Sequence, residues 1–211
     1  MDLKRQKEIQ KHFEGMYRAG QKPWRYYPPE KSLEEFFKRL EENPPAGGGK
    51  AKILDIGCGD GWISLQAASR GHEVWGIDSS QTAIEDATRA AEELNLKNSV
   101  HFEVGDALNL PYKDTFFDAI IDRGLFHHIL PENRNLYLQN ILRVLKKKTL
   151  VYLSVFSENN PVGIGQLFNK KKIEQIFGKD FEIVYFDEDP YPSSAPAHLL
   201  HFILRRTSRN F

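Results

Sequence analysis

The sequence predicts a doubly wound α/β fold built on one sheet of seven mostly parallel strands, with the last strand antiparallel. From Lys50 onward, short apolar runs alternate with stretches whose apolar residues recur at helical spacing, which is typical of parallel strands joined by crossover helices. The last two apolar runs are joined by a proline-rich loop without a helix, which predicts an antiparallel pair. The length of 211 residues suits a single core.

Two amphipathic helices are expected before the sheet. Ile9, Phe13 and either Met16 or Tyr17 recur at helical spacing ahead of Gly20. A capping box from Ser32 to Glu35 predicts the start of a second helix, whose apolar face consists of Leu33, Phe36, Phe37 and Leu40. Residues 43–49 are rich in proline and glycine and predict a surface connector. We therefore assign residues 1–49 to an N-terminal helical appendage and residues 50–211 to the main domain of one structural unit.

The main domain alternates between strands and helices in chain order. Strands are predicted at residues 53–56, 74–77, 100–104, 117–121, 150–156, 181–186 and 199–204. Helices are predicted at residues 62–69 and along the apolar faces within residues 83–94 and 138–145. A further helix with one apolar face follows a run of three lysines at residues 170–172. Such a charge run is usually a solvated helix face rather than a nucleic-acid groove.

Composition limits the class of function. Lysine and arginine number 29, as do aspartate and glutamate, so no net field directs the chain to nucleic acid or to an anionic membrane. No apolar run approaches the roughly 20 residues that span a bilayer, and the start of the chain carries no apolar signal core. The single cysteine, Cys58, excludes an intramolecular disulfide and agrees with a reducing compartment. We expect a cytoplasmic, small-molecule enzyme that is a monomer or a homodimer, without a nucleic-acid or membrane partner.

A glycine loop directly follows the first predicted strand. The sequence from Asp55 to Gly61 reads Asp-Ile-Gly-Cys-Gly-Asp-Gly, and such glycines allow a sharp turn and close approach to a ligand. Asp78 ends the next strand at about the 20-residue spacing at which a carboxylate binds the ribose hydroxyls of a nucleotide. Alone, the glycines could serve only the turn, and Asp78 followed by Ser79 could be only a helix cap. Together they indicate a nucleoside site.

The loop favours a cationic nucleoside without phosphate. Its glycine spacing is Gly-x-Gly-x-Gly, whereas dinucleotide-binding loops have Gly-x-Gly-x-x-Gly. Asp55 lies two residues before the first glycine, and its charge would repel a pyrophosphate and attract an ammonium or sulfonium group.

These residues resemble those of the class I S-adenosylmethionine-dependent methyltransferases, and the resemblance covers residues 50–206. It implies a Rossmann-like seven-stranded sheet and S-adenosylmethionine as cofactor, with S-adenosylhomocysteine as product. In the family the glycine loop lines the methionine part, the second-strand aspartate the ribose, and the residues after the third strand the adenine. The implied cofactor-binding residues are Asp55, Gly57, Cys58, Gly59, Asp78, Ser79, Asp106, Ala107 and Asp122.

The segment after the fourth strand is a candidate acceptor site, because ligands of open α/β sheets bind at the carboxyl ends of the strands. Its Phe126, His127 and His128 are candidates for substrate contact, and the two histidines are also candidate general bases. The alternative is that one histidine packs internally while the other faces solvent.

An aromatic segment at residues 22–29 is a candidate lid. It weakly resembles the N-terminal tryptophan segment of the thiopurine, thiol and tellurite methyltransferases. The resemblance implies that Trp24 covers the cofactor and that Tyr26 and Tyr27 contact the substrate. The alternative is that these aromatic residues only pin the chain to the core.

The expected reaction is direct in-line displacement, which requires orientation and desolvation but no metal. An NAD(P)-dependent oxidoreductase and a non-catalytic S-adenosylmethionine-binding protein are the alternative functions.

Overall fold

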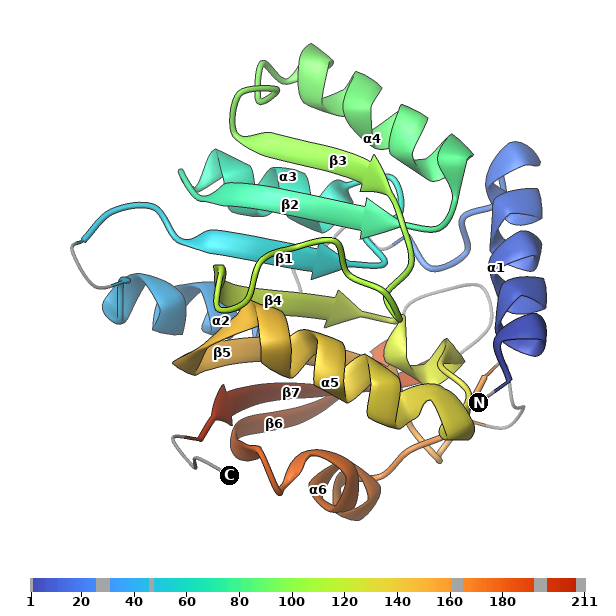
Figure 1. Cartoon of the computed structure of the whole chain (residues 1–211), viewed down its shortest axis with the longest axis vertical. Helices are drawn as coiled ribbons and strands as arrows, with labels where there is room; N and C mark the ends of the chain where they lie inside the picture. The colour runs from blue at the N-terminus through green and yellow to red at the C-terminus, as the bar shows by residue number, and fades with distance from the viewer. Residues whose placement is uncertain (1, 26–30, 46–47, 161–164, 192–196, 208–211) are drawn as a thin grey trace.

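A single seven-stranded sheet organises the molecule (Figure 1). The computed structural model describes residues 2–25, 31–45, 48–160, 165–191 and 197–207. Along the sheet the strands follow the order β3-β2-β1-β4-β5-β7-β6. Their bounds are β1 Lys52–Ile56, β2 Glu73–Asp78, β3 Val100–Val104, β4 Phe117–Arg123, β5 Leu145–Phe156, β6 Phe181–Tyr191 and β7 Ala197–Arg206. β7 runs antiparallel to both β5 and β6, and the other pairings are parallel, so the predicted fold class is confirmed.

The helices lie on both faces of this sheet and at its carboxyl edge. Helix α3 begins at Trp62 because Gly61, with φ of 77°, turns the chain out of the glycine loop, and it ends at Ser69 as predicted. Two 3₁₀ turns, η1 (Phe126–His128) and η2 (Pro131–Asn133), follow β4. The other helices are α1 Leu3–Arg18, α2 Lys31–Glu42, α4 Gln81–Glu93, α5 Arg134–Val144 and α6 Lys170–Phe177.

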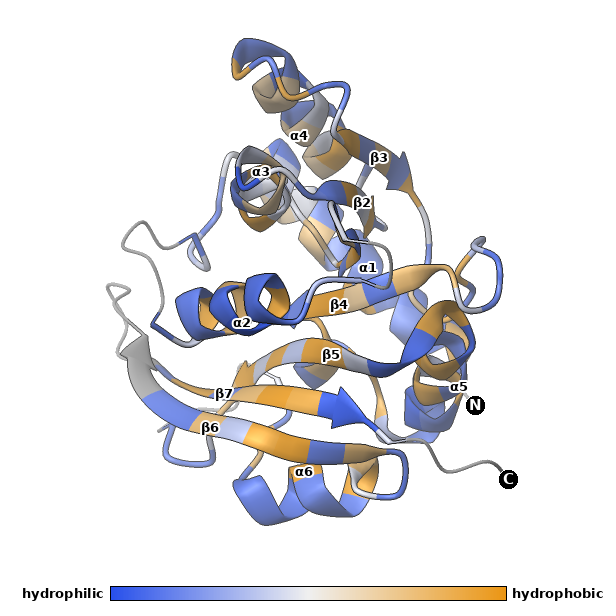
Figure 2. Ribbon diagram, turned by 90° about the vertical axis from the view of Figure 1, so that its left-hand side faces the viewer, coloured by the Kyte–Doolittle hydropathy of each residue, from blue (hydrophilic) through white to orange (hydrophobic). Residues whose placement is uncertain are grey.

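Hydrophobic packing divides into one cluster on each face of the sheet. On one face, residues of α5 and α6 such as Ile141 and Phe177 pack on Leu54 and Val151. On the other, residues of α2, α3 and α4 pack on Ile53 and its neighbours. Figure 2 shows the same division, with hydrophobic strands and hydrophilic outer surfaces on α2 and α6. Among the described residues, none of the helices has the length and hydropathy required to cross a bilayer.

Helix α2 is part of this core, which corrects its assignment to an appendage. Phe36 and Phe37 are fully buried in the same cluster as Ile53. The capping-box prediction at Ser32 is also wrong, because the helix already includes Lys31 and the buried Ser32 hydroxyl lies 3.0 Å from the hydroxyl of Tyr152. Among the described residues ahead of β1, α1 and the segment up to Arg25 therefore remain candidates for a lid.

Strand β5 begins at Leu145, five residues before its predicted start. Lys146 lies in the strand and pairs with Asp118 of β4 at 2.6 Å. The positive φ of Lys148, 61°, marks an irregularity within this strand.

Candidate active site

The glycine loop after β1 folds back on the end of β2. The N–H groups of Gly57 and Cys58 both donate to the carbonyl of Ile77, at 2.8 and 3.2 Å. Gly57 and Gly59 have φ values of 71° and 56°, which L side chains rarely adopt. These two glycines therefore bring the loop close to the carboxyl end of β2.

Asp78 links the glycine loop to helix α4. Its carboxylate accepts the N–H of Gly59 at 2.9 Å through Oδ2 and the N–H of Ser80 at 2.8 Å through Oδ1. Burial raises the pKa of Asp78, while backbone hydrogen bonds from Ser80, Gly59 and Ser79 oppose this shift. An ionised carboxylate has about four acceptor sites, so Asp78 retains capacity to accept a ligand hydroxyl.

Asp55 is buried below the loop. Its Oδ2 accepts the hydroxyl of Ser64 at 2.6 Å. Burial, together with the charges of Asp122 and Asp78, raises the pKa of Asp55 to about 7 against the opposing effect of the hydrogen bond from Ser64. The sheet edge therefore holds three carboxylates that interact electrostatically.

Asp122, at the end of β4, is held entirely by internal partners. Its Oδ2 accepts the hydroxyl of Tyr137 at 2.5 Å, and its Oδ1 accepts the N–H groups of Leu125 and Phe126 at 2.9 and 3.1 Å. Burial raises its pKa to about 6, and these hydrogen bonds oppose the shift. Asp122 thus fixes the β4–η1 turn.

Asp106 and Ala107 follow β3 on the same edge. The Oδ1 of Asp106 accepts the N–H of Leu108 at 2.9 Å, and Ala107 packs partly buried against the core. Gly105 is tied to β2 by its N–H, which donates to the carbonyl of Asp78 at 2.8 Å.

Helix α1 and Trp24 cover the carboxyl edge. Figure 1 shows α1 standing beside the ends of the central strands. Trp24 makes edge contacts with Tyr17 and Phe13, at 5.3 and 5.6 Å between ring centroids, and Phe13 contacts His128 at 4.7 Å. A continuous aromatic cover therefore extends to the η1 turn. Tyr26 and Tyr27 lie outside the described residues.

Tyr17 reaches the glycine loop itself, a role that its sequence position did not reveal. A Cβ at Gly59 would lie 2.3 Å from the Tyr17 hydroxyl, so this contact requires glycine. Burial raises the pKa of Tyr17, and the negative charges of Asp78 and Asp60 add to the shift. The helical pattern predicted only that either Met16 or Tyr17 belongs to the apolar face of this helix.

Polar contacts fasten α1 and the segment after it. Glu14 accepts the hydroxyl of Ser80 at 2.6 Å and that of Thr82 at 2.9 Å, at the start of α4. Lys22 lies 3.1 Å from a carboxylate oxygen of Asp60 and 2.8 Å from one of Asp86. These contacts attach α1 and the segment after it to the glycine loop and to helix α4.

The η1 turn holds the two candidate catalytic histidines in different surroundings. His127 is buried, its ring lies 4.0 Å from that of Phe156, and its Nδ1 has no hydrogen-bond partner among the described residues. Burial lowers the pKa of His127 well below its usual range and that of His128 to about 4. Both rings are therefore neutral at pH 7.

Phe126 does not line the acceptor site, and its predicted contact with substrate is corrected. It is fully buried and packs against the rings of Tyr137, Phe168 and Phe177 in the core. The turn from β4 into η1 points this side chain into the sheet face covered by α5 and α6.

A seven-stranded sheet with an antiparallel β7 defines the methyltransferase-like class of α/β folds. The most similar solved structures include the 1,6-didemethyltoxoflavin-N1-methyltransferase of Burkholderia thailandensis, with bound S-adenosylhomocysteine. The TM-score is 0.78 and the identity 21%, and the match covers 99% of this chain and 91% of that one. At this identity the likeness describes the fold.

Sequence comparison defines the family. Residues 53–148 match a family described as a methyltransferase domain. A 2-heptyl-1-hydroxyquinolin-4(1H)-one methyltransferase of Mycobacteroides abscessus is 37% identical over 142 residues, 64% of this chain and 59% of that protein. An uncharacterised methyltransferase of Schizosaccharomyces pombe is 34% identical over 109 residues, 51% of this chain and 73% of that protein. The chain belongs to the class I S-adenosylmethionine-dependent methyltransferases.

The residues at the carboxyl edge fit the cofactor of this family. The negative charges of Asp78 and Asp122 oppose the ionisation of Asp55, so a ligand that brings positive charge would relieve this repulsion. S-adenosylmethionine carries a sulfonium and an ammonium group and lacks phosphate. Its ribose also has hydroxyls that can donate to Asp78.

Proposed function

We propose that this protein transfers the methyl group of S-adenosylmethionine to a small-molecule acceptor. The observation that carries the proposal is the joint arrangement of the glycine loop and Asp78, which are connected by the hydrogen bond from Gly59 N–H to Asp78 at 2.9 Å. S-adenosylmethionine supplies an electrophilic methyl group on a positively charged sulfur. The protein must then bind it, orient an acceptor in line with the sulfur–methyl bond and exclude water.

We assign the cofactor contacts by position on the edge. The loop from Gly57 to Gly59 would hold the methionine part, with Cys58 between the two turns. Asp78 and Ser79 would bind the ribose, and Asp106 and Ala107 the adenine. Asp122 would act through its charge, because hydrogen bonds within the protein already occupy both of its oxygens. Asp55 would also act through its charge, because it is buried below the loop and accepts the hydroxyl of Ser64.

The acceptor side has an aromatic wall that suits a planar heterocycle. Phe13, Trp24 and His128 form one set of edge contacts, and Phe156 lies against His127 and His128. Rings of this kind favour flat aromatic ligands through edge and offset contacts. The Mycobacteroides and Burkholderia proteins are named for a hydroxyquinolinone and for 1,6-didemethyltoxoflavin, which are both planar heterocycles.

The two histidines point to an acceptor that needs little help to ionise. With pKa values lowered by burial, to about 4 for His128, they are weak bases at pH 7. A neutral imidazole can still accept or donate a hydrogen bond and so orient the acceptor. An acidic N–H or O–H on a conjugated ring, or a thiol, would supply the lone pair. Orientation of this kind can contribute on the order of 7 to 11 kcal/mol.

The cover formed by α1 would provide the dry environment for this reaction. Tyr17 and Trp24 close over the glycine loop, and an aromatic ring near a sulfonium can add about 0.5 to 2 kcal/mol by cation–π attraction. We place the reaction in the cytoplasm, where the lone Cys58 would remain reduced.

Incubation with methyl-labelled S-adenosylmethionine and a panel of hydroxyquinolinones, purine-like N–H heterocycles, thiols, phenols and amines tests the proposal. We expect label transfer first to the acidic heterocycles. Binding of S-adenosylhomocysteine without transfer to any acceptor would instead support a non-catalytic binding protein. Binding of NAD(P) in its place would support an oxidoreductase.

A further inference from the structure

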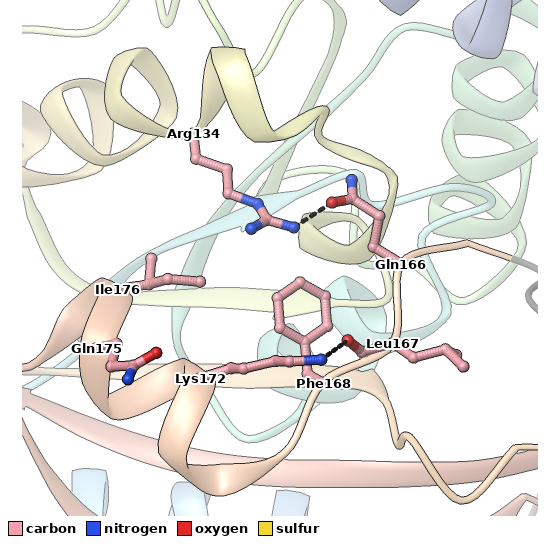
Figure 3. A pocket seen from close by; sticks show the side chains of 7 residues that line it. All are labelled: Arg134, Gln166, Leu167, Phe168, Lys172, Gln175 and Ile176. Carbon is pink, nitrogen blue, oxygen red and sulfur yellow. Dashed lines mark hydrogen bonds between the residues drawn. The ribbon is translucent and has the colours of Figure 1, made fainter.

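A cavity of about 370 Å³ lies away from the glycine loop, between the start of α5, the segment after β5 and helix α6 (Figure 3). None of the residues that line it belongs to β1, β2 or the turns that follow them. Its apolar surface comes from Leu167, Phe168 and Ile176. The proposed methyl transfer leaves this cavity without a role.

Two positively charged side chains border this apolar surface. Arg134 stacks over the ring of Phe168, with its guanidinium carbon 4.9 Å from the ring centroid, and its Nη2 donates to Oε1 of Gln166. Figure 3 shows the Phe168 ring between Arg134 and Lys172 in this view. Lys172 donates to the carbonyl of Leu167 at 3.3 Å.

The positive charge of the cavity is only weakly compensated. Among the described residues, no carboxylate forms an ion pair with Arg134, although Glu132 is close enough to act on its charge. The Nε of Arg134 is buried and has no hydrogen-bond partner there. Lys172 is 4.0 Å from Glu158, and both side chains are about half exposed, so this pair contributes little. A buried unpaired donor on a cation favours an anionic ligand.

Gln166 connects the cavity to the η1 turn. Its backbone N–H donates to the carbonyl of His127 at 3.0 Å, and its side-chain Nε2 donates to the carbonyl of Ile129 at 2.6 Å. The same side chain accepts from Arg134. A ligand that engages Arg134 would therefore act on a residue that holds two carbonyl groups of this region, those of His127 and Ile129.

We propose that this cavity is a second ligand site, which binds a small organic carboxylate with an apolar chain or ring. The carboxylate would lie between Arg134 and Lys172, and the apolar part would cover Phe168 and Ile176. Because the backbone N–H of Gln166 donates to the carbonyl of His127, binding would also shift the position of His127. The proposal requires neither S-adenosylmethionine nor methyl transfer.

Titration of the whole 211-residue chain with octanoate, without cofactor, tests the site. We expect saturable binding at millimolar concentration or below in calorimetry, and weaker binding of octanol, which has no charge. Amide shifts in ¹H–¹⁵N spectra should centre on Leu167 and Phe168 and extend to His127. Shifts centred on the glycine loop, or no saturation, would overturn the proposal.

Two neighbouring lysines provide a matched pair of variants. Lys172→Glu should weaken octanoate binding by about fivefold or more, because it reverses a charge at the cavity. Lys171→Glu makes the same change on an exposed residue that does not line it and should leave binding unchanged. Equal losses in the two variants would mean that only the net charge of α6 matters and would refute the site. Arg134→Lys provides a milder test that keeps the charge but removes the planar donor fork.

Discussion

At the scale of single residues, Asp78 makes the most specific contacts of the proposed cofactor site. Replacing it with alanine should weaken S-adenosylhomocysteine binding by about 1.5 to 3 kcal/mol, because charged hydrogen bonds to ribose are lost. Calorimetry measures this change directly. Glu73→Ala, at the opposite end of β2, is the control and should bind normally. An unchanged dissociation constant of S-adenosylhomocysteine in Asp78→Ala would mean that Asp78 only links Gly59 and Ser80 structurally.

Asp55 makes the stability of the protein depend on pH. Burial raises its pKa from 3.8 to about 7, so the folded protein binds more protons than the unfolded chain between these values. The contribution of Asp55 to the free energy of unfolding therefore falls as the pH rises from about 4 to about 7. Asn at this position can still accept the Ser64 hydroxyl but cannot ionise. Relative to wild type, Asp55→Asn should become more stable across this interval in urea denaturation, and a constant difference would contradict the shift.

The same ionisation links Asp55 to the cofactor. A cationic ligand favours the carboxylate form, so affinity for S-adenosylmethionine should rise as the pH increases through about 6 to 7.5 in wild type. In Asp55→Asn the rise should be smaller, and the residual slope would report Asp122, whose pKa is about 6. Calorimetric titrations across this range compare the two proteins. An identical pH dependence of affinity in the two proteins would show that Asp55 does not interact with the cofactor.

At the scale of elements, α1 and α2 have different roles although the sequence suggested one appendage. Glu14 and Lys22 fasten α1 to the nucleoside side of the sheet. The double variant Glu14→Ala, Lys22→Ala should show faster hydrogen exchange over residues 3–18 and a loss of methyl transfer of about tenfold or more. Its cofactor affinity should fall less, because opening the cover admits water and misaligns the acceptor. The exposed Lys11→Ala is the matched control, and normal turnover in the double variant would rule out a lid.

Helix α2, in contrast, belongs to the core. Phe37→Ala should lower the free energy of unfolding by about 3 to 5 kcal/mol, because it leaves a cavity between α2 and the sheet. Leu3→Ala, on the exposed part of α1, should change it by less than about 0.5 kcal/mol. Urea denaturation gives both values. A small effect of Phe37→Ala would restore the assignment of α2 to the appendage.

At the scale of the whole molecule, local sequence patterns predicted most of the fold because each strand is an apolar run between clear turn signals. The proline-rich connection correctly predicted the antiparallel β7, and Gly61 correctly marked the start of α3. The start of β5 was missed because it carries charged residues, of which Lys146 pairs with Asp118 on the neighbouring strand β4. Such pairing depends on tertiary structure and leaves no local pattern.

Part of the candidate site was likewise predictable from local sequence, and part was not. The glycine loop and Asp78 follow successive strands at a spacing typical of nucleotide-binding units, so the sequence alone predicted that they would lie together. The contacts of Tyr17 with Gly59 and of Glu14 with Ser80 join an N-terminal helix to distant turns, and only the folded chain reveals them. Phe126 was assigned to substrate because it adjoins two histidines, but its ring packs in the core against Tyr137, Phe168 and Phe177.

Thermal unfolding with S-adenosylhomocysteine, compared with NAD and NADP under the same conditions, tests the central claim most directly. A ligand at about 100 times its dissociation constant stabilises the folded protein by about 2.7 kcal/mol. S-adenosylhomocysteine should therefore raise the melting temperature in a concentration-dependent way, and neither dinucleotide should do so. Stabilisation by NAD or NADP, without any response to S-adenosylhomocysteine, would contradict the assignment of this site.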